Sequence, residues 1–307
     1  MFWYPPAPIR FAGLVSYPKV MTPAVEQTPR TALPWTRLAV FGALVLLCYA
    51  PILRRLAIQW MNDPDVGHGF FVPLVSGYII WQRRDQLLML EPRPNPWGLV
   101  VVAWGGLQMM VGVLGSDLFT SRTAFIITII GIVLTLGGTP FIRKLTFPLF
   151  LLFLMVPIPT VVFNELTFPL QMLASRLAAA ALGVLGIPVL RDGNILELPN
   201  GRLSVVEACS GIRSLLSLTF LSLVYGYFFE KKTWVRVALF LATIPVAILA
   251  NGSRVTVTGI LYEIRPDLAD GFFHESTGLV IFFVAAVILF VFHQVLIRSS
   301  RLLAARG

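Results

Sequence analysis

The sequence predicts an all-α integral membrane protein, a polytopic bundle of about eight transmembrane helices with one further interfacial or re-entrant helix. Three observations support this fold class: the 307 residues are 57% hydrophobic, only 13% are charged, and the mean hydropathy is +0.81. The charges cluster in short patches between long apolar runs, as is typical of chains that cross a bilayer repeatedly. The net charge of +9 comes from Lys and Arg at the ends of these runs, so it indicates membrane topology and not nucleic-acid binding.

Residues 1–34 predict an irregular, Pro-rich cytoplasmic arm. Their prolines are too closely spaced for a helix, and the segment lacks the compact apolar core of a signal peptide. Residues 35–307 are expected to form one transmembrane domain. Its apolar runs of span length are Arg37–Leu53, Gly67–Trp81, Gly98–Leu114, Thr123–Gly138, Leu145–Val161, Ile212–Phe229, Trp234–Ala250 and Glu275–Ile297.

A ninth run, Leu166–Pro188, is ambiguous. Its leucines have helical spacing, but it also contains Pro169 and Arg176, so it either spans the bilayer or lies at the interface. Charge bias favours the interface: with a cytoplasmic N-terminus and eight crossings, 15 of the 24 basic residues but only a few of the 15 acidic ones lie inside. If this run crossed, the basic cluster Glu230–Arg236 would lie outside. We therefore predict eight spans and an interfacial or re-entrant ninth segment.

Three potentially reactive residues reach the outer face in this topology. Cys209 lies just before the sixth span, Arg254 just past the seventh, and His274 at the mouth of the eighth. The charge count used neither Cys209 nor His274, so their convergence with Arg254 is informative. The pattern indicates a thiol centre at the membrane surface.

The chemistry of these residue types suits a covalent thiol reaction. A thiolate is the nucleophile, and a nearby imidazolium or guanidinium lowers the pKa of its thiol. His274 is the candidate to accept the thiol proton and return it to a leaving amine. Arg254 stays protonated, so its candidate roles are to stabilise the thiolate or an oxyanion, or to hold a substrate carboxylate. The structural alternatives are a buried small Cys, an Arg that reaches the headgroups, and a His that caps a helix.

Other polar residues compete with or support this centre. His68 is also expected near the outer edge and is the alternative base. Ser210, Arg213 and Asn251 are candidate supporting residues, because a thiolate site needs hydrogen-bond donors. Cys48 and His293 fall inside the first and last spans and are interpreted as structural, and two cysteines at different levels make a disulfide improbable. No metal site and no cofactor are expected.

Three ordered sequence blocks carry a resemblance to a known family: Val206–Ser214 (VEACSGIRS), Asn251–Val255 (NGSRV) and Phe273–Gly278 (FHESTG). They look like the three blocks of the exosortase/archaeosortase family. Further agreement lies in Trp60–Pro64 with His68-Gly69-Phe70, in Pro157-Ile158-Pro159, and in Gly186–Val189 leading to Asp192-Gly193-Asn194. The resemblance covers roughly Trp35 to Ile297, so that residues 35–307 become an exosortase-like transmembrane domain and the arm is unmatched.

The resemblance implies a bacterial inner-membrane cysteine protease or transpeptidase whose active site faces the periplasm. It carries Cys209, Arg254 and His274 over as the family's proposed catalytic residues. The implied substrates are secreted proteins with a C-terminal PEP-CTERM-like sorting tag, which consists of a short motif, a transmembrane helix and a basic end. The implied partners are these tagged proteins, the lipid bilayer and a separate exopolysaccharide-system protein.

Two other classes remain open from the residues alone. A membrane glycosyl- or acyltransferase acting on envelope polymers would be expected to rely on Asp, Glu or His, whereas the best motif here contains a thiol. A transporter would need ionisable groups near the bilayer midplane and often repeats in its halves. Neither feature is clear, because the polar residues gather at the ends of the spans.

Overall fold

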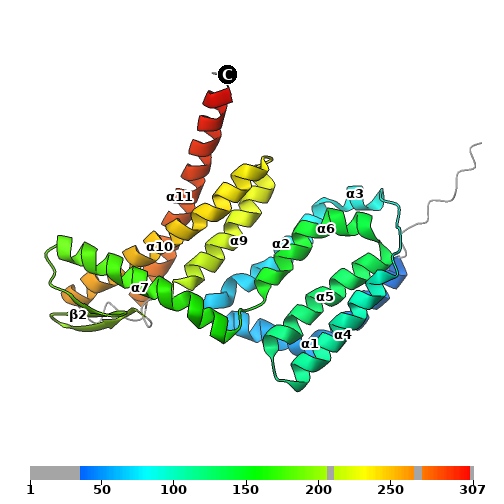
Figure 1. Cartoon of the computed structure of the whole chain (residues 1–307), viewed down its shortest axis with the longest axis horizontal. Coiled ribbons are helices and arrows are strands. Elements are labelled where there is room, and N and C mark those ends of the chain that lie inside the picture. The colour runs from blue at the N-terminus through cyan, green and yellow to red at the C-terminus, as the bar shows by residue number, and fades with distance from the viewer. Residues whose placement is uncertain (1–34, 206–210, 266–271, 305–307) are drawn as a thin grey trace, which may run out of the picture. The chain divides into compact units, whose positions relative to one another are not determined.

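The computed structural model describes residues 35–205, 211–265 and 272–304. This part of the chain is almost entirely helical, which confirms the predicted all-α fold (Figure 1). The predicted arm, Cys209 and Ser210 lie outside the described residues. The helices are α1 (Trp35–Asn62), η1 (Pro64–Phe70), α2 (Phe71–Gln82), α3 (Arg84–Leu88), α4 (Trp97–Leu114), α5 (Leu118–Leu136), α6 (Thr139–Leu151), η2 (Leu152–Met155), α7 (Thr160–Val184), α9 (Ile212–Phe229), α10 (Thr233–Ile264) and α11 (Phe272–Ala304).

Seven of the described helices are long and apolar enough to cross a membrane, which supports a multi-pass membrane protein. They are α1 from Val40, α4, α5, α7, α9, α10 and the Ser276–Ser300 part of α11. This set differs from the eight predicted spans at three positions.

Two predicted spans form shorter helices. Gly67–Trp81 is divided between the 3-10 helix η1 and the 12-residue helix α2. Leu145–Val161 is divided between the 13-residue helix α6, η2 and the start of α7. Pro157 and Pro159 follow η2, and because proline has no backbone N–H, the α6 helix cannot continue through them. Neither α2 nor α6 alone has the length of a full crossing.

The ambiguous run Leu166–Pro188 lies largely within α7, a continuous 25-residue helix that contains Pro169. The helix begins six residues before the predicted run, at Thr160, and its first two residues belong to the predicted span Leu145–Val161. By length and composition α7 is able to cross. Figure 1 shows α7 running transversely to α9 and α11. Its interfacial placement stays a prediction.

The N-terminal helices share one core, to which α1, α2, α5 and η2 contribute. Tyr49 of α1 is 3% exposed, and its hydroxyl lies 2.8 Å from the hydroxyl of Thr128 on α5. Asp117 caps the N-terminal end of α5, and its carboxylate accepts hydrogen bonds from the backbone N–H groups of Phe119 and Thr120. The buried members of the core are Tyr49, Ile52, Leu56, Val72, Ile79, Ala124, Phe125, Ile126, Leu151, Met155 and Val156.

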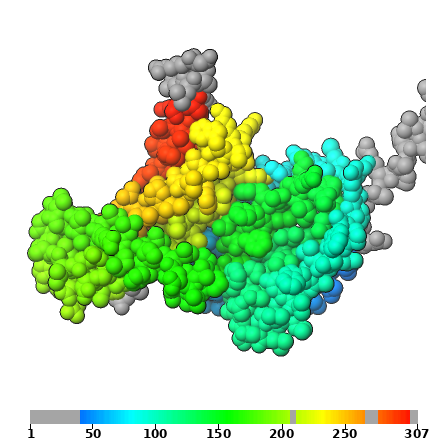
Figure 2. All heavy atoms as spheres, viewed as in Figure 1, coloured from blue at the N-terminus to red at the C-terminus, as the bar shows by residue number. Residues whose placement is uncertain are grey.

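The helices α9, α10 and α11 form a second packed group. Its buried core contains Leu218 of α9, Ala247 and Ala250 of α10, and Ala285 and Leu289 of α11. The alanines bring the helices close together, as is usual between membrane helices. The C-terminal turns of α11 extend beyond the turn that joins α9 to α10 (Figures 1 and 2).

A three-stranded antiparallel sheet connects α7 to the segment that contains Cys209. Its strands β1 (Leu190–Asp192), β2 (Ile195–Leu198) and β3 (Gly201–Ser204) follow the order β1-β2-β3. The register pairs Asp192 with Ile195 and Leu198 with Gly201.

This sheet is held by both neighbouring helices. The side chain of Asn200 donates hydrogen bonds of 3.0 Å to the backbone and the carboxylate of Glu263 on α10. The hydroxyl of Ser175 on α7 donates a 3.0 Å hydrogen bond to the carbonyl of Gly193. These hydrogen bonds fix the sheet, and with it the end of β3 at Ser204, against α7 and α10.

Candidate active site

The candidate residues are distributed over four elements. Asn251 and Arg254 lie on α10, Arg213 lies in the first turn of α9, His68 lies in η1, and position 274 lies in the first turn of α11. Cys209 and Ser210 lie outside the described residues, immediately before Gly211. The structure describes the backbone at position 274 but not the imidazole.

The first two sequence blocks meet where Asn251 lies against Gly211. Gly211 caps the N-terminal end of α9 with a φ of 73°, a left-handed conformation that favours glycine. A Cβ at this glycine would stand 2.7 Å from Nδ2 of Asn251. The Asn251 side chain is 4% exposed, so α10 buries an amide directly against the start of α9.

The second and third blocks meet where Arg254 lies against Gly278 of α11. A Cβ at Gly278 would stand 2.9 Å from Cζ and 3.0 Å from Nη2 of Arg254, so the guanidinium occupies space that only a glycine leaves. Position 274 lies four residues earlier in the same helix. Residues at this spacing share one helix face, so α11 places position 274 one turn from the contact with Arg254.

Arg213 lies in the same region but is held by η1. Its Nε donates a hydrogen bond to Oδ1 of Asp65 at 3.1 Å, in an ion pair whose Arg213 side chain is 42% exposed. Arg213 and Arg254 both line a cavity of about 380 Å³ between η1, α9, α10 and α11. Its lining residues are Pro64, Arg213, Ser214, Ser217, Arg254, Gly278, Leu279 and Phe282.

His68 lines a different and more apolar cavity of about 230 Å³ beneath η1, with Leu216 of α9 and residues of η2. Nδ1 of His68 is buried and has no hydrogen-bond partner in the part of the chain that the structure describes. Burial lowers the pKa of His68, which lies outside the candidate spans, and the Leu154 backbone partly opposes this effect. The cavity of His68 shares no lining residue with the cavity of Arg254.

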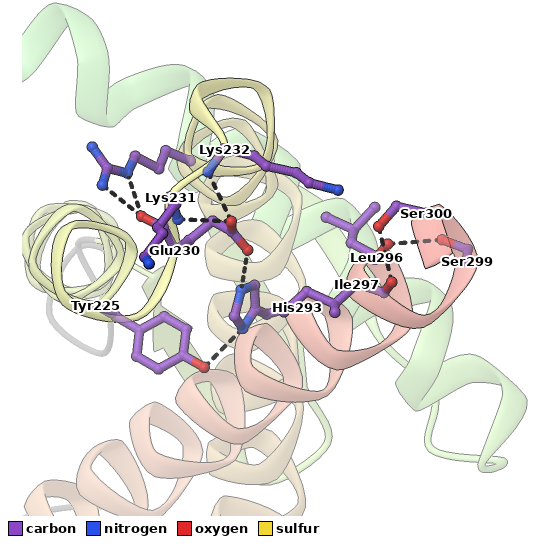
Figure 3. A network of polar contacts seen from close by, with 10 residues as sticks. Tyr225, Glu230, Lys231, Lys232, His293, Leu296, Ile297, Ser299 and Ser300 are labelled. Atoms are coloured by element: carbon purple, nitrogen blue, oxygen red, sulfur yellow. Dashed lines mark hydrogen bonds and ion pairs between the residues drawn. The ribbon is translucent and has the colours of Figure 1, made fainter. Parts of the chain in front are cut away.

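A buried polar network that the sequence analysis did not recognise lies at the junction of α9, α10 and α11 (Figure 3). His293 is 2% exposed, its Nδ1 lies 2.8 Å from the hydroxyl of Tyr225, and its Nε2 lies 3.3 Å from Oε2 of Glu230. A neutral imidazole satisfies both contacts when Nε2–H donates to Glu230 and Nδ1 accepts from Tyr225. The structural interpretation of His293 agrees with this position.

Glu230 is the centre of this network. Its Oε1 accepts hydrogen bonds from the backbone N–H groups of Lys231 and Lys232 at 2.7 and 2.8 Å. The Lys232 N–H and the His293 ring lower the pKa of Glu230, while burial opposes them. In the sequence Glu230 stands out only as an isolated acidic residue within a basic cluster. Its contact with His293 becomes visible only when α9 and α11 are packed together.

The fold and these contacts define a polytopic helical membrane protein in which Asn251 and Arg254, two polar residues within α10, lie against Gly211 at the start of α9 and Gly278 of α11. Comparison with protein-family models matches residues 60–291 to the transmembrane exosortase family. The match covers more than half of the chain, and the protein belongs to this family. Among curated proteins and solved structures, no match was found.

Proposed function

We propose that this exosortase is a cysteine protease or transpeptidase that removes C-terminal sorting tags from secreted proteins at the outer face of the bacterial inner membrane. Cys209 is the nucleophile, His274 is the proton carrier, and Arg254 supplies fixed positive charge. The tag is of the PEP-CTERM kind, and the acyl-enzyme is resolved by water or by an acceptor nucleophile. The released proteins serve the cell envelope, and a separate exopolysaccharide-system protein is a partner.

The observation that carries this proposal is the pair of helix contacts that joins the three sequence blocks. Asn251 lies on Gly211, two residues after Cys209 in the sequence, and Arg254 lies on Gly278, one turn after position 274. Gly211 and Asn251 are forty positions apart in the sequence. In both contacts a polar side chain of α10 lies against a glycine from another sequence block. A thiol centre built from these blocks would use the groups that α10 presents at both contacts.

The cavity beside Arg254 supports a peptide substrate. It combines an apolar wall, formed by Leu279 and Phe282, with the hydroxyls of Ser214 and Ser217. Ligand sites typically combine an apolar lining with a few polar groups, and here the apolar wall would contact side chains of the tag while the hydroxyls would bind its backbone. A substrate whose own tail helix lies in the bilayer would reach this cavity by lateral diffusion. The membrane would then hold the substrate near the active site, which lowers the entropic cost of bringing the two together.

The experiment uses a tagged reporter, defined as a secreted protein fused to a C-terminal tail from the same genome with a short motif, a transmembrane helix and a basic end. We expect cells with the wild-type chain to shorten the reporter, and cells with Cys209→Ala to leave it full length in the membrane. Cys48→Ala is the matched control, because Cys48 is exposed on α1 and belongs to none of the three blocks. An immunoblot of reporter and enzyme reads out both.

Two results would contradict the proposal. Normal shortening by Cys209→Ala would remove the thiol mechanism and favour a membrane glycosyl- or acyltransferase. Solute uptake into vesicles that survives the loss of Cys209 would favour a transporter.

A further inference from the structure

We propose that Asn251 and the N-terminal end of α9 together form the oxyanion hole of this reaction. The inference deepens the proposed function and rests on it, because it assigns the group that stabilises the substrate carbonyl oxygen during attack by Cys209.

The N-terminal end of α9 presents backbone donors. Among the described residues the first helical hydrogen bond of α9 runs from the Leu215 N–H to the Gly211 carbonyl, so the N–H groups of Ile212, Arg213 and Ser214 have no partner within Gly211–Phe229. Gly211 has no side chain to cap them. The helix dipole of this 18-residue helix adds partial positive charge at the same end, which favours a developing anion.

The side chain of Asn251, which lies against Gly211 at this helix end, gives independent evidence for a ligand site. Its Nδ2 is buried and has no hydrogen-bond partner in the described part of the chain, although the side chain is only 4% exposed. Buried amides of this kind are normally satisfied. The missing acceptor therefore points to a ligand, and a carbonyl oxygen or oxyanion is the acceptor that an amide N–H recognises.

Other asparagines of the chain show what a structural amide looks like. Nδ2 of Asn200 donates to Glu263 twice, and Nδ2 of Asn194 donates to the side chain of Gln171 at 3.3 Å. Asn251 differs because its Nδ2 has no such partner among the described residues, and Asn251 lines a small cavity beside the end of α9. This cavity is lined by Leu170, Gly211, Leu215, Ala247, Ile248 and Asn251.

The position of Arg254 separates its role from that of Asn251. Asn251 lies against α9, whereas the guanidinium three residues later lies against Gly278 of α11. The helix α10 therefore presents a neutral donor to the end of α9 and a permanent cation to α11. The neutral donor binds the oxygen without neutralising the thiolate, and Arg254 is left to favour ionisation of the thiol or to hold the substrate.

The Cys209 thiolate forms a bond to the carbonyl carbon of the tag, and the electron pair of the C=O double bond moves onto oxygen, where Asn251 and the α9 N–H groups stabilise it. Collapse of this intermediate restores the double bond and breaks the C–N bond. The leaving amine takes the proton that His274 removed from the thiol, and a thioester remains on Cys209.

The test uses the purified full chain in a Cys48→Ala background, with the tagged reporter as substrate. We expect Asn251→Ala to lower kcat by about 10²–10³-fold, the usual effect of removing one oxyanion donor, with little change in KM. Asn251→Asp should be no better, because a carboxylate accepts hydrogen bonds and repels an oxyanion. Asn164→Ala is the matched control, because Asn164 is exposed on α7, and it should keep kcat within about threefold.

A second measurement separates oxyanion binding from a structural role. Alkylation of Cys209 by iodoacetamide passes through no oxyanion, so its rate should stay within about twofold in Asn251→Ala. A parallel fall in alkylation and processing would show that Asn251 positions the thiol and would overturn the inference. An unchanged kcat in Asn251→Ala would overturn it as well. Neither result affects the proposed function, which is tested separately by the processing of the reporter in Cys209→Ala.

Discussion

The guanidinium of Arg254 on α10 rests on the backbone of Gly278 on α11, with Cζ only 2.9 Å from the place where a Cβ would stand. This contact links two helices through a charged group that is costly to keep near lipid unless it serves a function. The helix α11 carries position 274 one turn away on the same face. Gly278 thus sets the distance between Arg254 and the helix that carries the proposed proton carrier.

Gly278→Ala is therefore expected to move the guanidinium while the protein stays folded, because a long flexible side chain yields more easily than backbone. We expect processing of the tagged reporter to fall at least about tenfold, since displacing an active-site group by about 1 Å has large effects. Gly106→Ala on α4 is the matched control, because a Cβ there meets nothing within 4 Å. Normal processing by Gly278→Ala would show that the Arg254 position is not critical.

The choice between two histidines gives a second prediction. His274→Ala should abolish reporter processing, whereas His68→Ala should leave it measurable, because His68 lines a cavity that shares no residue with that of Arg254. The measurement is the initial rate of shortening at equal enzyme abundance. The opposite pattern would assign the proton carrier to His68.

The sequence predicted the fold class and most long helices correctly because apolar runs of span length leave few alternatives to a membrane helix. The prediction was wrong where prolines within an apolar run decide whether the helix ends. Prolines 157 and 159 separate α6 and η2 from α7, whereas Pro169 lies inside α7 without ending it. Composition does not distinguish these cases, because neighbouring helices decide whether a lost backbone hydrogen bond is tolerated.

The candidate site was predictable as residue types but not as contacts. The blocks around Asn251 and Arg254 are visible in the sequence, yet the two glycines that receive these side chains are recognised only once α9, α10 and α11 are packed. The network around His293 was not predictable in the same way, because Glu230 and His293 lie 63 residues apart and meet only through that packing.

Topology gives a third prediction, because the proposed outer site requires that α7 does not cross the bilayer. In a background without native cysteines, Asp192→Cys should react with a membrane-impermeant thiol reagent added from outside, and Lys231→Cys should not. Both positions are exposed, so accessibility within the fold does not bias the comparison. Labelling of Lys231→Cys with protection of Asp192→Cys would place α7 across the membrane and exclude the outer-face site.

The buried Glu230 network gives the last prediction, which concerns stability and pH. In the folded protein the pKa of Glu230 lies below its ordinary value, chiefly because the Lys232 N–H donates to the carboxylate. The ionised group therefore stabilises the fold above the unfolded-state pKa of about 4.3, and this stabilisation is lost as the pH falls through the lower folded-state value. Glu230→Gln removes the charge and should lower the unfolding free energy at pH 7 by about 1.5–3 kcal/mol, the usual value for hydrogen bonds to a charged group.

The measurement is denaturant unfolding of the detergent-solubilised chain at pH 7 and at about pH 3. The deficit of Glu230→Gln should shrink at acidic pH, because protonation removes the same stabilisation from the wild-type protein. Glu91→Gln is the control, since Glu91 is exposed and should show no deficit at either pH. A deficit of Glu230→Gln that stays constant between the two pH values would mean that the ionised carboxylate does not stabilise the junction of α9, α10 and α11.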